Sequence, residues 1–168
     1  MSKKFRIHSI NIEGFKWFTK PQEIIIDEKN VFIFGPNTFG KSSIAEAIVW
    51  CLFGSEPNKD FQPKNVFYLG ECKVVLSLMK EDQIWKFSRR IPIETTQSDV
   101  TITDPEGKTF NEVYKILPQL KKLSHGEGAH VLFSQQERAQ RLLTDLSDFE
   151  KVIAAYLNLD RAMDIIEQ

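Results

Sequence analysis

Apolar and polar positions alternate at the start of the chain and then change to a helical spacing. The alternation runs over residues 5–12, and two short apolar runs follow at 23–27 and 31–34. These runs predict three β-strands with short connections between them. From residue 42 to residue 53 the apolar side chains recur at helical spacing, which predicts an amphipathic helix. Gly54 directly after this stretch supplies a helix stop.

The middle of the chain has the pattern of an antiparallel β-meander. Its β-branched and aromatic residues fall into three segments, CKVVLSLM at 72–79, QIWKFSRRI at 83–91 and DVTITD at 99–104. Turn-like residues separate the first two segments and follow the third. This composition favours strands that are joined by turns.

Helical spacing returns after residue 111. The segment EVYKILPQLKKL at 112–123 is followed by a glycine-containing loop and by the short apolar segment HVLFSQQ at 130–136. Ser147 and Glu150 have the spacing of a capping box for a further helix, and the helical pattern continues to the last residue.

The composition is that of a soluble globular protein with room for one core of ordinary domain size. Among the 168 residues, 42% are hydrophobic and 27% are charged. We expect three parts: strands and the first helix in 1–56, the meander in 57–110 and helical segments in 111–168. The formal net charge of −1 gives no bulk attraction to nucleic acid, so a DNA contact would need local basic patches.

The start of the chain and the cysteines give no sign of export. The first residues lack the apolar core of a signal peptide, and no apolar run approaches the roughly 18 residues that span a bilayer. We therefore expect a cytoplasmic protein that makes no membrane contact. Cys51 and Cys72 lie in apolar segments without a CxxC pair, which favours two buried free thiols over a disulfide or a zinc site.

One motif carries specific chemistry. Residues 35–42 read GPNTFGKS, which matches the P-loop pattern GxxxxGK[ST] between a predicted strand and a predicted helix. Backbone N–H groups and the positive end of the helix dipole bind phosphates in such a loop. Lys41 adds a charge near the β- and γ-phosphates of a nucleoside triphosphate, and the Ser42 hydroxyl can ligate Mg²⁺. The expected nucleotide-binding residues are Gly35, Pro36, Asn37, Thr38, Phe39, Gly40, Lys41, Ser42 and Ser43.

Two residues of the P-loop are unusual. Thr38 and Phe39 stand where related loops have glycine or another small residue. A β-branched residue is poorly suited to positive φ, so either Thr38 has an ordinary conformation or the loop is strained and binds nucleotide less tightly. Phe39 has two interpretations: it packs against the protein, which we favour, or it shapes the nucleotide pocket.

Four stretches of the chain together resemble a known family. They are INIEGFKWF at 10–18, FIFGPNTFGKSSIAEAIVWCLFG at 32–54, IWKFSRRI at 84–91 and HVLFSQQERAQRLLTDLSDFEKVIAAYLNLD at 130–160. Their order and content resemble the N-terminal half of an SMC-like ATPase head, closest to the SbcC-type ATPases of double-strand-break repair. The resemblance implies an α/β fold: a P-loop ABC-type ATPase N-lobe with a mixed sheet, an antiparallel β-meander subdomain and a helical segment that leads into a coiled coil.

The resemblance also implies roles for two residues outside the P-loop. Gln135 matches the Q-loop glutamine, which completes the Mg²⁺ shell with Ser42 and senses the γ-phosphate, and Gln136 is the neighbouring alternative. Lys41 and Gln135 are thus the expected catalytic residues. Lys16 stands where the family often has a basic residue near the phosphates, although a solvated surface lysine has the same sequence signal.

Other parts that the family uses for hydrolysis do not occur in order in this sequence. These are a Walker B strand, a signature loop and a switch histidine. The segment VVLSLMKED at 74–82 fits a strand that enters a hairpin better than a Walker B, and LSHGEG at 123–128 precedes the Q-loop, where a signature loop does not belong. The resemblance therefore implies a C-terminal half, either beyond a coiled coil or as a separate chain.

The leading hypothesis is half of a DNA-acting ATPase head that binds ATP and Mg²⁺. It would hydrolyse ATP only when a C-terminal half completes it and a second head pairs with it, so the fragment alone would be inactive. Break repair, chromosome organisation and SMC-like anti-phage systems such as Lamassu all fit, in the cytoplasm at the nucleoid or in a nucleus. The implied partners are the C-terminal half, a second head, DNA phosphates and a nuclease subunit.

Two other functions compete with this hypothesis. The first is a non-hydrolysing module in which ATP gates dimerisation of two heads. The second is a self-contained P-loop kinase, which the antiparallel meander disfavours because such kinases alternate strands and helices around a parallel sheet. The candidate patches for DNA phosphates are Lys3, Lys4 and Arg6, then Arg89 and Arg90, and then Lys121 and Lys122.

Overall fold

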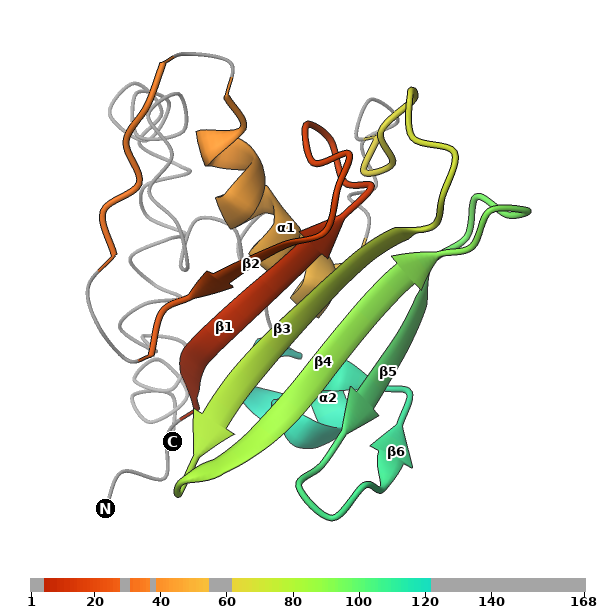
Figure 1. Cartoon of the computed structure of the whole chain (residues 1–168). Coiled ribbons are helices and arrows are strands. Elements are labelled where there is room, and N and C mark those ends of the chain that lie inside the picture. Colours follow the sequence, from red (N-terminus) through yellow and green to blue (C-terminus); the bar gives the residue numbers. More distant parts are fainter. Residues whose placement is uncertain (1–4, 28–30, 37–38, 55–61, 122–168) are drawn as a thin grey trace, which may run out of the picture. The chain divides into compact units, whose positions relative to one another are not determined.

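The computed structural model describes residues 5–27, 31–36, 39–54 and 62–121 (Figure 1). Its contacts separate Met1–Pro118 from Gln119–Gln168, and the first unit contains all of the described strands. The elements are β1 (Arg6–Glu13), β2 (Gln22–Ile25), α1 (Lys41–Phe53), β3 (Cys72–Lys80), β4 (Gln83–Ile91), β5 (Asp99–Thr103), β6 (Thr109–Phe110), α2 (Val113–Ile116) and the short 3-10 helix η1 (Pro118–Leu120).

The described strands form one six-stranded sheet in the order β2-β1-β3-β4-β5-β6. Each neighbouring pair of strands is antiparallel. β3 and β4 are joined by Glu81 and Asp82, whose φ angles of 52° and 61° suit the tight two-residue hairpin turns that match the twist of the strands. The predicted meander of three strands at 72–104 is confirmed by β3, β4 and β5.

One face of the sheet carries the core. Ile10, Leu76, Phe87 and Ile102 are neighbours in the strand register, and all four are fully buried. α1 covers this face and lies behind the sheet in Figure 1, in contact with β1, β3 and β4. The alternation of apolar residues that predicted the strands therefore also defines the side of the sheet that is buried.

Both cysteines lie in this core as free thiols, as the sequence predicts. The Cys51 thiol on α1 donates to the backbone carbonyl oxygen of Phe87 at 3.3 Å, which joins the helix to β4. Burial raises the pKa of Cys51 and of Cys72 to about 12 in each case. Neither thiol is therefore poised as a reactive thiolate.

α1 agrees with the predicted helix at both ends. It begins after Gly40 and ends before Gly54, whose N–H group donates to the Trp50 carbonyl oxygen at 2.9 Å. Gly54 has φ of 84°, a conformation that glycine adopts readily at the end of a helix. The predicted helix and its glycine stop are confirmed.

The strand expected at residues 31–34 is absent, so this prediction is wrong. The segment belongs to none of the described strands, and Phe32 and Phe34 are 89% and 93% exposed. An apolar run becomes a strand only where a neighbouring strand supplies hydrogen bonds, and no described strand pairs with this one. The described sheet is accordingly antiparallel throughout, rather than the mixed sheet that was expected.

The helical spacing predicted at 112–123 forms only short pieces among the described residues. α2 has four residues, and η1 begins at Pro118. A proline lacks the N–H group that would continue the helix, which explains the break. None of the helices in the described ranges is long and apolar enough to cross a membrane. The predicted helices after residue 122 lie outside the described residues.

Candidate functional site

The P-loop, residues 35–42, leads directly into α1. Gly40 occupies the position directly before the first residue of this helix, and it has a left-handed conformation with φ of 77°. A Cβ atom at Gly40 would lie only 3.2 Å from the Cβ of Trp17 and 3.6 Å from the ring of Phe18. Both the backbone conformation and the close contact therefore require glycine at this position. Asn37 and Thr38 lie outside the described residues.

The N-terminus of α1 has the features of an anion site. Gly40 has no side chain with which to cap the helix, and the first turn contains no acidic residue. The first N–H groups of a helix have no partner within the helix, and the dipole makes this end positive. Phosphate oxygens match both features.

Lys41 lies in the first turn of α1, and its side chain folds back over the P-loop. Its Nζ donates to the carbonyl oxygens of Gly35 at 2.9 Å and Pro36 at 2.7 Å. These bonds hold the ammonium group against the loop that matches the phosphate-binding pattern. The positive charge of Lys41 therefore lies beside the described part of the P-loop.

The two serines after Lys41 have different surroundings. Ser42 is exposed, so its hydroxyl is accessible to a ligand, as the expected role in Mg²⁺ binding requires. Ser43 is 4% exposed, so its side chain faces the core. Ser43 can contribute to a phosphate site mainly through its backbone N–H group.

Lys16 is held beside the P-loop helix. Its Nζ lies 2.8 Å from the Glu46 carboxylate, and about a quarter of each side chain is exposed. The Lys16 backbone N–H donates to the Pro63 carbonyl oxygen at 2.8 Å, and the Asn65 side-chain amide donates to the Lys16 carbonyl oxygen. Lys16 is thus a partly buried residue with defined partners, rather than a solvated lysine. The signal available in the sequence was Glu46, the acidic residue of the segment 41–53.

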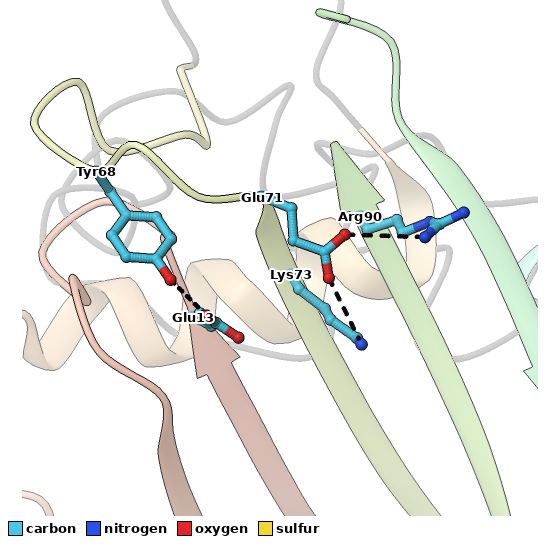
Figure 2. A network of polar contacts seen from close by, with 5 residues as sticks. All are labelled: Glu13, Tyr68, Glu71, Lys73 and Arg90. Carbon is cyan, nitrogen blue, oxygen red and sulfur yellow. Dashed lines mark hydrogen bonds and ion pairs between the residues drawn. The ribbon is translucent and has the colours of Figure 1, made fainter. Parts of the chain in front are cut away.

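Residues 62–71 form a loop that connects the turn at Lys16 to the sheet. Asn65 donates its backbone N–H to the Gly14 carbonyl oxygen at 2.8 Å. Tyr68 points at Glu13, the last residue of β1, and its hydroxyl donates to the carboxylate (Figure 2). The hydrogen bond to Glu13 is the main cause of a raised pKa of Tyr68. Gly14 lies directly under this ring.

An ion cluster lies nearby, at the start of β3 and the end of β4. The Glu71 carboxylate lies 3.7 Å from the Lys73 amine and 3.8 Å from the Arg90 guanidinium. Figure 2 draws both ion pairs as dashed lines. Arg90 is exposed, but this carboxylate offsets part of its charge. It is therefore a weaker candidate for DNA phosphates than a run of two arginines indicates.

Arg89 does not belong to a DNA-binding surface. It is 9% exposed, and its Nε donates to the Cys51 carbonyl oxygen at 3.1 Å. Its guanidinium also donates to the Ser98 hydroxyl at 3.3 Å, and burial lowers the pKa of Arg89. The prediction that Arg89 contacts DNA phosphates is wrong because β4 turns this side chain toward α1. Arg6 and Lys121 are exposed, whereas Lys3, Lys4 and Lys122 lie outside the described residues.

A pocket beside the P-loop was not predicted from the sequence. It has a volume of about 380 Å³ and is lined by Trp17, Phe18, Thr19, Lys20, Gln22 and Phe39. Phe39 is 74% exposed and Trp17 is 64% exposed, so neither ring is buried in the core. Our favoured interpretation, in which Phe39 simply packs against the protein, is therefore wrong. The tryptophan that follows GFK was the signal available in the sequence.

The structure brings together the described P-loop residues and Lys16. The side chains of Lys16 and Glu46 meet beside the helix that carries Lys41. Gln135, the expected Q-loop glutamine, lies outside the described residues, as does Gln136. Its proximity to Ser42 stays a prediction.

Comparison with known proteins gives one family and two kinds of relative. Residues 9–168 match the family described as AAA domain. The chain is 41% identical over 70 residues, 41% of its length, to the chromosome partition protein Smc of Aquifex aeolicus. It is 26% identical over 160 residues, 90% of its length, to the probable DNA double-strand break repair Rad50 ATPase of the same organism. The Smc protein of Mesomycoplasma hyorhinis is 37% identical over 114 residues, 65% of this chain. The chain spans 6%, 16% and 11% of the lengths of these three relatives.

Proposed function

Because the chain belongs to the AAA domain family and is an N-terminal head region of the SMC-like, SbcC-type ATPases, we propose that it binds ATP with Mg²⁺. The comparisons confirm the family resemblance that the sequence indicated. The proposed site consists of residues 35–43 with Lys16 beside them. The observation that carries the proposal is Lys41, which lies over the P-loop at an uncapped helix N-terminus.

Nucleotide binding would exchange the partners of Lys41. Its ammonium group now donates to two backbone carbonyls, and phosphate oxygens are stronger acceptors because they are charged. The backbone N–H groups after Gly40 would bind the same phosphates. The exposed Ser42 hydroxyl is a hard oxygen ligand of the type that Mg²⁺ prefers, and the resemblance adds Gln135 as a second ligand. Bound Mg²⁺ would neutralise charge on the phosphates during transfer.

Hydrolysis requires a C-terminal half in this proposal. The sequence holds no Walker B strand or signature loop in the expected order, so it has no evident carboxylate with which to orient an attacking water. Residues 31–34 lead into the P-loop and expose Val31, Phe32, Ile33 and Phe34 by 43% to 93%. We propose that strands of the C-terminal half pair with this segment, which would bury it.

The wider role proposed is conformational work on DNA by two paired heads. The names of the relatives refer to chromosome partition and to double-strand break repair, and both processes involve DNA. Break repair, chromosome organisation and anti-phage defence are all compatible with this head. The proposed partners are a second head, DNA phosphates and a nuclease subunit, and the proposed location is the cytoplasm at the nucleoid.

The test is ATP binding and turnover by the chain alone and together with its C-terminal half. The chain alone should bind ATP weakly and hydrolyse none, and the C-terminal half should restore turnover. In that assembly Gln135→Ala should lower turnover more than ATP affinity, because a γ-phosphate sensor acts mainly after binding. Hydrolysis by residues 1–168 alone, lost in Lys41→Ala, would overturn the half-head model.

The same assay distinguishes the proposed ATPase from the second candidate function, which is a module that dimerises on binding ATP without hydrolysing it. A completed head that binds ATP and dimerises without turnover would be the nucleotide-gated module. Turnover that depends on Lys41 would exclude it.

A further inference from the structure

We propose that Glu46 is a positioning residue of the nucleotide site, which holds the Lys16 ammonium group on the face of α1 that carries Ser42. Lys16 would contact phosphate, and Glu46 would act through Lys16. This inference rests on the proposed function, since it assumes that residues 35–43 bind the phosphates of ATP. It adds a residue that lies outside the P-loop motif.

Lys16 has a backbone conformation that suits glycine better than lysine. Its φ is 46°, in the left-handed region, where a Cβ atom meets steric resistance. The surrounding chain imposes this conformation: the Lys16 N–H donates to the Pro63 carbonyl oxygen at 2.8 Å, and the Asn65 amide donates to the Lys16 carbonyl oxygen. A strained backbone that its neighbours hold in place is typical of ligand sites. A lysine at this position therefore indicates that its side chain is used.

The Lys16 side chain is held as well as its backbone. Its Nζ lies 2.8 Å from the Glu46 carboxylate, and the two side chains are 24% and 27% exposed. A free lysine side chain loses rotamer freedom when it binds a ligand, and a lysine that is already held loses less. An ammonium group has three N–H donors, so it can bind Glu46 and a phosphate oxygen at the same time.

Glu46 lies where it can bring this charge to the phosphate end of the helix. Ser42 and Glu46 are four positions apart in α1, so they share one face of the helix. Helical side chains lean toward the N-terminus, which directs the Glu46 carboxylate toward the turn of Ser42. Trp17, which follows Lys16, packs at the same end, because a Cβ atom at Gly40 would lie 3.2 Å from the Trp17 Cβ.

The pair also removes a charge that would oppose nucleotide binding. Glu46 is the acidic residue of α1, and a carboxylate without its cation, one turn from Ser42, would repel phosphate. Lys16 neutralises this carboxylate. Loss of Lys16 alone should therefore weaken binding more than loss of both residues.

A double-mutant cycle tests the coupling between the two residues. Calorimetry with Mg²⁺ and a non-hydrolysable ATP analogue would compare the wild-type chain with Glu46→Gln, Lys16→Met and the double variant. Glu46→Gln should weaken binding by about fivefold, because Lys16 is no longer held. Lys16→Met should weaken it by about thirtyfold, because a cation is lost and a carboxylate is left unpaired. The double variant should be about tenfold weaker than wild type, so Glu46→Gln should improve binding once Lys16 is gone.

Lys16→Gly separates a functional lysine from a structural one. Glycine adopts a φ of 46° without strain, so Lys16→Gly should resist chemical denaturation better than Lys16→Ala. Both variants should nevertheless bind ATP equally weakly, because both lack the ammonium group. If the lysine served only to fold the turn, ATP affinity would instead follow stability.

Two control substitutions lie in other parts of the fold. Glu81 has a φ of 52° in the turn between β3 and β4, so Glu81→Gly should be more stable than Glu81→Ala without a change in ATP affinity. Glu112 pairs with Lys115 at 2.9 Å, so Glu112→Gln removes a paired carboxylate of the same kind. That variant should also bind ATP like the wild-type chain.

Two results would overturn the inference. If Glu46→Gln has the same effect with Lys16 and with Met at that position, Glu46 does not act through Lys16. If Glu46→Gln alone leaves ATP affinity unchanged or raises it, the carboxylate does not position Lys16 for phosphate.

Lys41→Ala distinguishes this inference from the proposed function. If Lys41→Ala binds ATP like the wild-type chain, the proposed function itself fails. If Lys41→Ala loses ATP binding while the Lys16 and Glu46 variants retain it, only the role of Glu46 fails.

Discussion

The backbone polar groups at the two ends of α1 differ in what surrounds them. At the C-terminal end, the Arg89 guanidinium is buried and donates to the Cys51 carbonyl oxygen at 3.1 Å. At the N-terminal end, Gly40 has no side chain and the first turn has no carboxylate. The negative end of the helix dipole is therefore balanced by the protein itself. The positive end offers its N–H groups to a ligand.

This difference separates a structural end of the helix from a binding end. A buried charge is costly unless it is hydrogen-bonded, so the Arg89 contacts contribute to stability. Within the part of the chain that the structure describes, the Lys41 ammonium group at the other end donates to exposed loop carbonyls, which a ligand can replace. Substitutions at the C-terminal end should change stability, and substitutions at the N-terminal end should change nucleotide binding.

Lys41→Ala should have the largest effect. We expect ATP affinity to fall by about a hundredfold, because the variant loses charge-assisted hydrogen bonds to phosphate. The melting temperature should stay the same, since the Lys41 side chain does not pack in the core. Calorimetry with a non-hydrolysable ATP analogue and a thermal melt would measure both. Lys86→Ala, an exposed lysine on β4, is the control. Unchanged affinity with an unchanged melting temperature would remove Lys41 from the site.

Arg89→Met tests the structural end of the helix. The variant should lose about 2 kcal/mol of stability, because the Cys51 carbonyl loses its buried donor. Arg90→Met is the matched control and should cost less than about 0.5 kcal/mol, since Arg90 is exposed and its ion pair is long. Chemical denaturation would measure both. Equal losses in the two variants would mean that Arg89 does not secure the end of α1.

Gly40→Ala should lower stability at the binding end of the helix. We expect the free energy of unfolding to fall by about 2 kcal/mol, because the left-handed backbone and the close Trp17 atom both oppose a methyl group. Gly107→Ala is the control: its φ of 87° is similar, and no atom lies within 4 Å of its Cβ position. That variant should cost about 1 kcal/mol. If both variants lose the same stability, the contact between Trp17 and Gly40 adds no constraint.

Glu46→Gln should have a small effect on stability. The ion pair with Lys16 is partly buried, so its loss should cost less than about 1 kcal/mol. Glu112→Gln provides the comparison, because the pair between Glu112 and Lys115 has a similar length but is more than half exposed. That second variant should be nearly neutral in chemical denaturation. A neutral Glu46→Gln would mean that burial adds nothing to the Lys16 pair.

Thr38→Gly should have the smallest effect. Glycine permits loop conformations that a β-branched residue resists, so ATP affinity should rise slightly or stay the same. Calorimetry on this single variant is sufficient. A marked loss of affinity would mean that Thr38 contacts the nucleotide directly.

The orientation of Arg89 shows how much information the strand pattern contains. Phe87, Arg89 and Ile91 are two positions apart in the sequence, so they point to the same face of β4. Phe87 and Ile91 are apolar, which assigns that face to the core and places Arg89 there too. Taken only as neighbours in the sequence, Arg89 and Arg90 indicate a basic surface patch. The period of two instead puts one arginine in the core and one in solvent.

Residues 31–34 show the opposite case, in which an apolar run with the composition of a strand does not form one among the described residues. Their apolar run predicts a strand, but the described part of the chain supplies no strand that pairs with it. Strand formation depends on a partner as well as on local composition. The composition of residues 31–34 alone could not have revealed this.

By itself, the sequence determined the P-loop motif, the helix that follows it and the meander, because side-chain periodicity and glycine positions act over a few neighbouring residues. Tertiary structure decided which residues surround that motif. It placed Trp17 against Gly40, the Glu46 carboxylate against Lys16, and Arg89 under the end of α1. Each of these contacts joins residues from different elements or loops of the fold. They depend on how the chain packs, and local sequence patterns do not encode that packing.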